Sequence, residues 1–175
     1  YTVEMMKYYR GDFVSIVYPV SFKVVPLLNT TLPAPDREAV LDFHKDVAEL
    51  GRVAIGADRL VSEYNTRLKY LKAAQEQMPN PQPELMITAR KLEADLREID
   101  YKLSGNPSFS KRNEPEPPSI TGRIGTIVWN TINSTSAPTQ THRDSYAAAL
   151  KDTESVLADL NKLIEDVKAL EAKME

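Results

Sequence analysis

The chain contains no cysteine and only two histidines, and this limits the sites it can build. Without cysteine there is no disulfide, no thiolate ligand for a metal and no cysteine nucleophile. The histidines, His44 and His142, offer little for histidine-based catalysis. Neither has the glutamate three residues earlier that a di-iron helical bundle requires. We expect both histidines to be structural or exposed.

Concentrated charge and long apolar runs are also missing. Lys and Arg number 22 against 25 Asp and Glu, for a formal net charge of −3. Nucleic-acid surfaces and polybasic membrane anchors need concentrated positive charge, so we expect neither. No apolar run approaches the roughly 20 residues that a membrane-spanning helix needs, so we expect no membrane span. Because the common catalytic and cofactor motifs are absent as well, we predict no catalytic, cofactor-binding or metal-ligating residue, and no enzymatic activity of this chain.

Aromatic and β-branched residues dominate positions 1–28. Residues 1–9 and 13–18 each predict a short strand. Pro19 interrupts this run, and residues 20–24 then alternate between apolar and polar, as in a half-buried strand. We predict a three-stranded meander, which is marginal by itself in water. It either completes a β-sandwich whose earlier strands precede Tyr1, or packs on the helices. We favour the sandwich, and expect the chain to be a fragment of a longer protein.

Helical periodicity replaces the strand pattern after a connector at residues 29–35. A heptad seam predicts one long helix over residues 36–78, on Val40, Phe43, Val47, Leu50, Ala54, Ala57, Val61, Tyr64, Leu68 and Leu71. Similar patterns predict helices at 83–103, 119–133 and 139–174. The expected fold class is mainly α. We predict an antiparallel bundle of three long helices plus one short helix over residues 36–175, with Leu68 and Leu160 in its core.

Residues 108–118 carry three prolines and four charges, and we name this segment the strap. Its composition argues against helix or central strand, so we expect an ordered, extended segment over the surface. We expect it to continue past the second helix and to bring the third helix against the N-terminal half of the first. The single tryptophan, Trp129, is then expected in the core, close to Phe43 or Val47.

Several short motifs have ordinary structural interpretations. Arg10-Gly11-Asp12 matches a tripeptide that integrins read, but it also has the composition of a hairpin turn. Two N-glycosylation sequons begin at Asn29 and Asn133, and both have the composition of cap-forming loops. Charged helix positions such as Glu93 with Arg97, or Asp95 with Glu98, are expected on solvated faces.

Three stretches together resemble a known family. They are FKVVPLLNTTLPAPDREAVLDFHKDVAEL (22–50), SGNPSFSKRNEPEPPSITGRIG (104–125) and STSAPTQTHRDSYAAAL (134–150). They are similar to the C-terminal region of large bacterial proteins with a sortilin-like β-propeller of BNR/Asp-box repeats, often labelled glycosyl hydrolases. In that family a small β-sandwich follows the propeller and a helical tail closes the chain. The Asp-box repeats themselves are absent here, so the resemblance places no catalytic residue in this chain.

The resemblance implies an extracytoplasmic protein and a non-catalytic C-terminal module. Its partner would be the upstream propeller or sandwich of the same protein, or a separate protein. Two alternatives stay open. The chain could border the active site of a propeller glycoside hydrolase or peptidase, with Glu114 and Glu116 of the strap facing that site. It could also be a stand-alone coiled-coil scaffold that dimerises through the first long helix.

Overall fold

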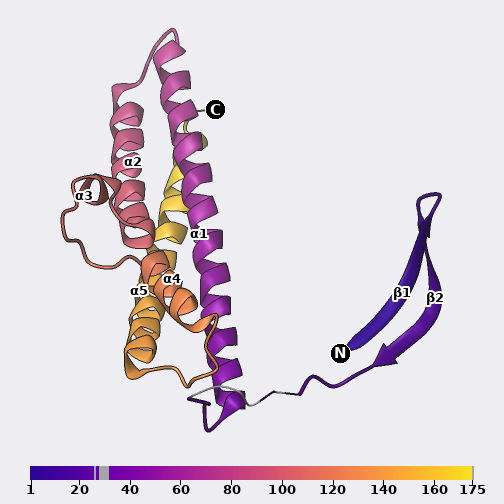
Figure 1. The fold of residues 1–175 in the computed structure, drawn as a ribbon. Coiled ribbons are helices and arrows are strands. Elements are labelled where there is room, and N and C mark those ends of the chain that lie inside the picture. Colours follow the sequence, from indigo (N-terminus) through magenta and orange to yellow (C-terminus); the bar gives the residue numbers. More distant parts are fainter. Residues whose placement is uncertain (26, 28–31, 175) are drawn as a thin grey trace. The chain divides into compact units, whose positions relative to one another are not determined.

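The computed structural model describes residues 1–25, 27 and 32–174. The chain divides into two compact units, Tyr1–Pro33 and Ala34–Glu175. The first unit contains two strands and the second contains five helices, within the described residues (Figure 1). The prediction of a mainly helical chain with an N-terminal β segment is therefore confirmed.

The β unit is a hairpin of two antiparallel strands, β1 (Thr2–Tyr9) and β2 (Asp12–Ser21). The predicted third strand is wrong, because β2 runs through Pro19 to Ser21. The register shifts between Val3 and Met5, whose partners are Val20 and Val17, so Pro19 falls where no residue is paired with it. A bulge of this kind tolerates the missing N–H of proline.

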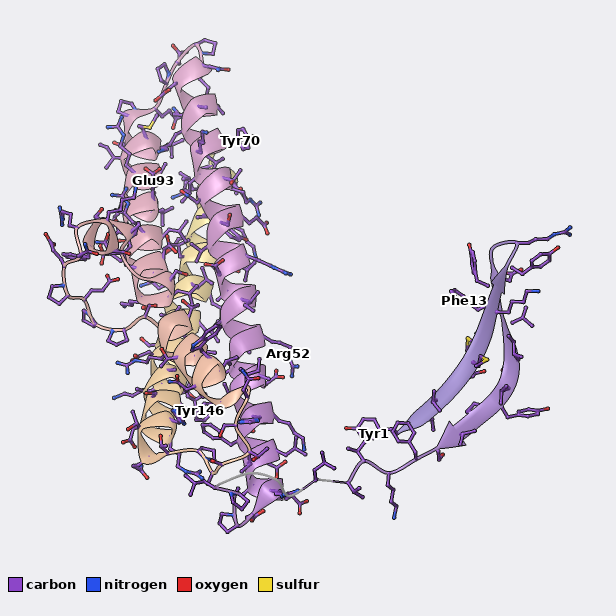
Figure 2. All side chains as sticks on the ribbon, viewed as in Figure 1. Tyr1, Phe13, Arg52, Tyr70, Glu93 and Tyr146 are labelled. Carbon is purple, nitrogen blue, oxygen red and sulfur yellow. The ribbon has the colours of Figure 1, made fainter. Side chains whose placement is uncertain are left out.

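The side chains of this hairpin are exposed within its unit. Tyr1 lies at the open end and Phe13 at the turn, as Figure 2 shows. The rings of Tyr8 and Phe13 approach to 5.0 Å between centroids, and those of Tyr1 and Phe22 to 5.9 Å. The large exposed apolar residues of the strands are Val3, Met5, Met6, Tyr8, Tyr9, Phe13, Val14, Ile16, Val17, Tyr18 and Val20. A two-stranded hairpin with uncovered faces is marginally stable by itself.

The longest element is α1 (Arg37–Gln77), which begins at a side-chain cap and ends before a proline. The Asp36 carboxylate accepts a hydrogen bond from the Ala39 N–H at 3.0 Å, satisfying one of the free donors of the first turn. Met78 is extended, as expected for a residue before Pro79. The buried seam of α1 consists of Phe43, Val47, Leu50, Ala54, Ala57, Val61, Tyr64 and Leu68, with Gln75 beyond it.

Two further long helices, α2 (Pro83–Ser104) and α5 (Gln140–Glu171), pack on α1 and on each other (Figure 1). Lys72 on α1 bonds both carboxylate oxygens of Glu93 on α2 at 2.7 Å. Near the other end of α2, the Ser104 hydroxyl donates to Asp58 at 2.9 Å. From Glu93 to Ser104 along α2 the partner in α1 moves back from Lys72 to Asp58, so these two helices are antiparallel.

The directions of α1 and α5 follow from contacts near each end. The Phe43 and Tyr146 rings, both early in their helices, lie 5.8 Å apart. The Arg67 guanidinium makes two bonds, of 2.9 and 3.0 Å, to the carboxylate of Glu171 at the end of α5. The two helices therefore run in the same direction, so the predicted antiparallel packing holds for α1 and α2 but not for α1 and α5.

The strap is not wholly extended, and this corrects the prediction. Pro107–Lys111 forms a short helix, α3, capped by the Asn106 side chain, which accepts from the Ser108 N–H at 2.9 Å. Pro107 suits the first turn of this helix, where its missing N–H costs nothing. The strap also does not continue past α2, because its C-terminal part turns back and bonds the residue before α3. The Glu116 carboxylate accepts from the Asn106 N–H at 3.1 Å.

The short helix α4 (Ile120–Thr131) follows the strap and packs against α1 and α5. The Ser119 hydroxyl caps it by accepting from the Gly122 N–H at 3.1 Å. A Cβ placed on Gly51 of α1 would lie 3.6 Å from Ile124 Cγ2, an ordinary van der Waals contact, so the two helices lie side by side here. As predicted, α4 therefore lies against the N-terminal half of α1 (Figure 1).

The prediction that Trp129 is buried is wrong, because this side chain is 82% exposed. The buried face of α4 consists of Ile120, Ile124, Ile127 and Thr131. Trp129 lies two residues beyond Ile127, which is about 200° around an α-helix. Apolar residues occur on all faces of α4, but only one face packs against α1 and α5. Trp129 lies on another face and is therefore exposed.

Candidate functional site

Both histidines have structural surroundings. The His44 ring lies 6.4 Å from the Phe43 ring at the edge of the seam. His142 belongs to a capping box at the start of α5. Its N–H donates to the Thr139 hydroxyl at 3.2 Å, and its Nδ1 accepts from the Thr139 N–H at 3.4 Å. Within the residues that the structure describes, no group of three or more His, Asp and Glu side chains is arranged to hold a metal ion.

The short motifs lie in turns. Tyr9 pairs with Asp12, so Arg10 and Gly11 form the two-residue turn between β1 and β2. Both have positive φ, 54° and 95°, as this tight hairpin turn requires. Asn133 is exposed in the connection between α4 and α5. The sequon that begins at Asn29 lies outside the described residues.

The carboxylates of the strap are engaged within the chain. Glu114 forms an ion pair with Arg112 at 2.9 Å, and Glu116 accepts from the Asn106 N–H. Glu93 does not lie on a solvated face as predicted, since it is partly buried in its bond with Lys72. Of these carboxylates, Glu93 joins α2 to α1 and Glu116 joins the strap to the residue before α3, while the Glu114 pair lies within the strap.

A carboxylate pair lies at the interface of α1 and α2. Burial, and secondly the negative charge of Asp58, raise the pKa of Asp100 above its ordinary value of 3.8. Asp58 accepts a hydrogen bond from Ser104, while Asp100 is partly buried. Since burial disfavours the charged carboxylate and the negative charge of Asp58 adds to that effect, ionised Asp100 destabilises the folded helical unit.

The surface between α2 and α5 contains a groove of about 510 Å³. Charges of both signs line it, among them Lys91 and Asp95 of α2 and Lys162 and Asp166 of α5. Its apolar lining consists of four core residues, Leu92, Ile99, Leu163 and Leu170, and the partly buried Leu85. With balanced charge along its rim, this groove indicates no particular class of ligand.

A second groove, of about 430 Å³, lies among the C-terminal part of α2, the strap and α5, and we name it the strap groove. Its residues are Glu98, Tyr101, Lys102, Asn106, Phe109, Glu116, Pro117, Pro118, Ser119, Asp152, Ser155 and Val156. Tyr101, Phe109 and the two prolines give it apolar walls. Its volume falls within the range of small-ligand sites.

The charge of the strap groove is negative. Three carboxylates line it against one lysine, Lys102, which pairs with Asp159 at 3.4 Å. Glu116 is held by the Asn106 N–H. Among the described residues, Glu98 on α2 and Asp152 on α5 have no ion-pair or hydrogen-bond partner for their carboxylates. The groove therefore presents two unpartnered negative charges from two helices beside an aromatic wall.

Sequence reasoning did not identify this groove. Glu98 was expected on a solvated helix face, and Asp152 carried no motif. The available signal was the spacing of Glu98 and Tyr101, which puts a carboxylate and an aromatic ring on neighbouring positions of one helix face. That spacing gives no information about Asp152 or the strap, because the folding of the chain brings them to this face.

No helix within the described residues is long and apolar enough to cross a membrane. No family model, curated protein or solved structure matches this chain.

Proposed function

We propose that this chain is a non-catalytic C-terminal accessory and interaction module of a larger exported protein with a sortilin-like β-propeller. In this proposal the hairpin is the end of a β-sandwich. The helical unit is a bundle of three long helices, α1, α2 and α5, with α4 as the short fourth helix. Partners are the upstream domains of the same protein or a separate protein.

The observation that carries the proposal is the uncovered hairpin. Its two strands expose a row of tyrosines, valines and methionines within the β unit. Large exposed apolar patches mark surfaces that another protein segment covers. Further strands of a sandwich would pair with the free edges and bury one face, which agrees with the family that the sequence resembles.

Two observations favour this module over the alternatives. The seam of α1 is buried by other helices of the same unit, so it has no free apolar face for a coiled-coil dimer. Glu114 and Glu116 bond Arg112 and the Asn106 N–H, so they are engaged rather than presented to an active site. An exported location follows from the resemblance alone and is part of the proposal.

Hydrogen exchange tests the proposal directly. Amides of β1 and β2 should exchange rapidly in the 175-residue chain and slowly in a longer product of the same gene that includes the upstream domains. Amides around Leu68 serve as the control and should be equally protected in both. Equal exchange of the hairpin in the two proteins would contradict the proposal. So would turnover of a glycan or peptide substrate by the 175-residue chain, if a point substitution in it abolished that turnover.

A further inference from the structure

We propose that the strap groove binds an arginine side chain of a partner protein. This inference rests on the proposed role of the helical unit as an interaction module, and it names the chemistry that the partner contributes. The carboxylates of Glu98 and Asp152, both exposed in the groove, are the groups that recognise the charge.

Charge complementarity selects a cation. Of the four charged residues in the groove, Lys102 and Glu116 already have partners, and the other two are carboxylates. An incoming cation would therefore meet two carboxylates that are not engaged in an ion pair. An anion would meet an excess of negative charge, three carboxylates against one lysine that is already paired.

The apolar wall selects arginine among cations. A guanidinium is planar and weakly hydrated, stacks on aromatic rings and can bond a carboxylate through two N–H groups. Tyr101 offers an aromatic surface next to Glu98, and Pro117 and Pro118 offer apolar contact for the side-chain methylenes. The strap already holds one such contact, since the Arg112 guanidinium lies 5.7 Å from the centroid of the Phe109 ring. A second arginine would use the Tyr101 side of the groove.

The strap supplies a wall that is fixed in place. The Asn106 side chain caps α3, the Glu116 carboxylate bonds the Asn106 N–H, and the Thr121 hydroxyl donates to the Leu103 carbonyl at 3.0 Å. These bonds close the loop on the end of α2. The groove is thus largely formed before a ligand arrives, which reduces the entropy lost on binding.

NMR titration of the ¹⁵N-labelled 175-residue chain tests the inference. The probe is acetyl-Gly-Arg-Gly-amide, and its neutral isostere with citrulline in place of arginine is the matched ligand. We expect saturable shifts at the amides of Tyr101, Phe109 and Ser155 with the arginine peptide. We expect binding at least about ten-fold weaker with the citrulline peptide, because the charge is lost while the shape is kept.

Variants locate the binding. The double substitution Glu98→Gln with Asp152→Asn should weaken arginine-peptide binding at least about ten-fold, because both charges are removed. Glu154→Gln, an exposed carboxylate of α5 outside the groove, should leave it unchanged. Equal binding of the two peptides to the unmodified chain would overturn the inference, as would unsaturable shifts or undiminished binding by the double variant. None of these results depends on the hairpin, so this test can fail while the proposed function stands.

Discussion

Replacing Leu68 with alanine should strongly destabilise the helical unit. Leu68 has no exposed surface and lies in the seam of α1, within the single hydrophobic core formed by the long helices and α4. Deleting one methine and two methyl carbons there removes buried apolar contact and leaves a cavity that the packed helices fill only in part. Leu→Ala changes at buried sites cost about 2–5 kcal/mol, and we expect a loss within that range at Leu68.

The matched control is Leu60→Ala on the same helix. Leu60 is 38% exposed, so the same chemical change there removes much less buried surface. Leucine and alanine are both good helix formers, so the helix propensity of α1 changes little in either variant. We expect a loss below about 1 kcal/mol at Leu60. The difference between the two variants isolates the contribution of burial.

Urea unfolding followed by circular dichroism at 222 nm measures both losses. With a slope of about 2 kcal/mol per molar urea, Leu68→Ala should lower the midpoint by about 1–2.5 M. The melting temperature should fall by about 4–20 °C. Leu160→Ala on α5, where the leucine is 1% exposed, should behave in the same way. A loss below about 0.5 kcal/mol at Leu68, or equal losses at Leu68 and Leu60, would refute the packing of the core described above.

Three further predictions test other features of the helical unit. Asp100 binds its proton more tightly in the folded than in the unfolded state, so its contribution to stability falls as pH rises from 3.8 through its raised pKa. Asp100→Asn should therefore raise the melting temperature more at pH 7 than at pH 3, and an equal change at both would contradict this. The emission of Trp129 should be that of a solvated indole, and acrylamide should quench it equally in the folded and urea-unfolded chain; a blue-shifted, shielded emission would contradict its exposure. A double-mutant cycle of Arg67→Ala and Glu171→Ala should give a coupling of about 0.5–1 kcal/mol, kept small because Arg67 is 39% exposed. Additive losses would show that this ion pair does not help to join α1 to α5.

The local pattern of the sequence was sufficient to predict where the long helices lie and which of their faces are buried. Spacings of three and four between apolar residues from Phe43 to Leu68 indicated the buried face of α1, and those residues are buried. Cap-forming side chains at Asp36, Ser119 and Thr139 stand at the starts of α1, α4 and α5. These features depend on residues within a few positions of one another, so periodicity and capping chemistry predict them. The resemblance to sortilin-like propeller proteins stays a prediction, which the exchange experiment addresses.

Other features depended on what lies next to each element in space. The pattern of α4 offered several apolar faces, and contact with α1 and α5 buried the isoleucine face while Trp129 stayed exposed. Pro19 was expected to end a strand, but the bulge opposite β1 accommodates it. The proline content of the strap argued against helix, yet its first four residues, 108–111, lie in α3, because the strap's three prolines come after them and Pro107 occupies the first turn, where proline is tolerated.

The sequence by itself therefore determined the helical class, the buried seams of the long helices and the starts of α1, α4 and α5 to within one residue, since each arises from neighbours along the chain. Tertiary structure decided the parallel course of α1 and α5, the exposure of Trp129 and the strap groove. Glu98 and Asp152 are 54 positions apart in the sequence, and they line one groove because α2 and α5 pack side by side. No local pattern encodes such a meeting, because it depends on how separate helices bury their apolar faces against each other.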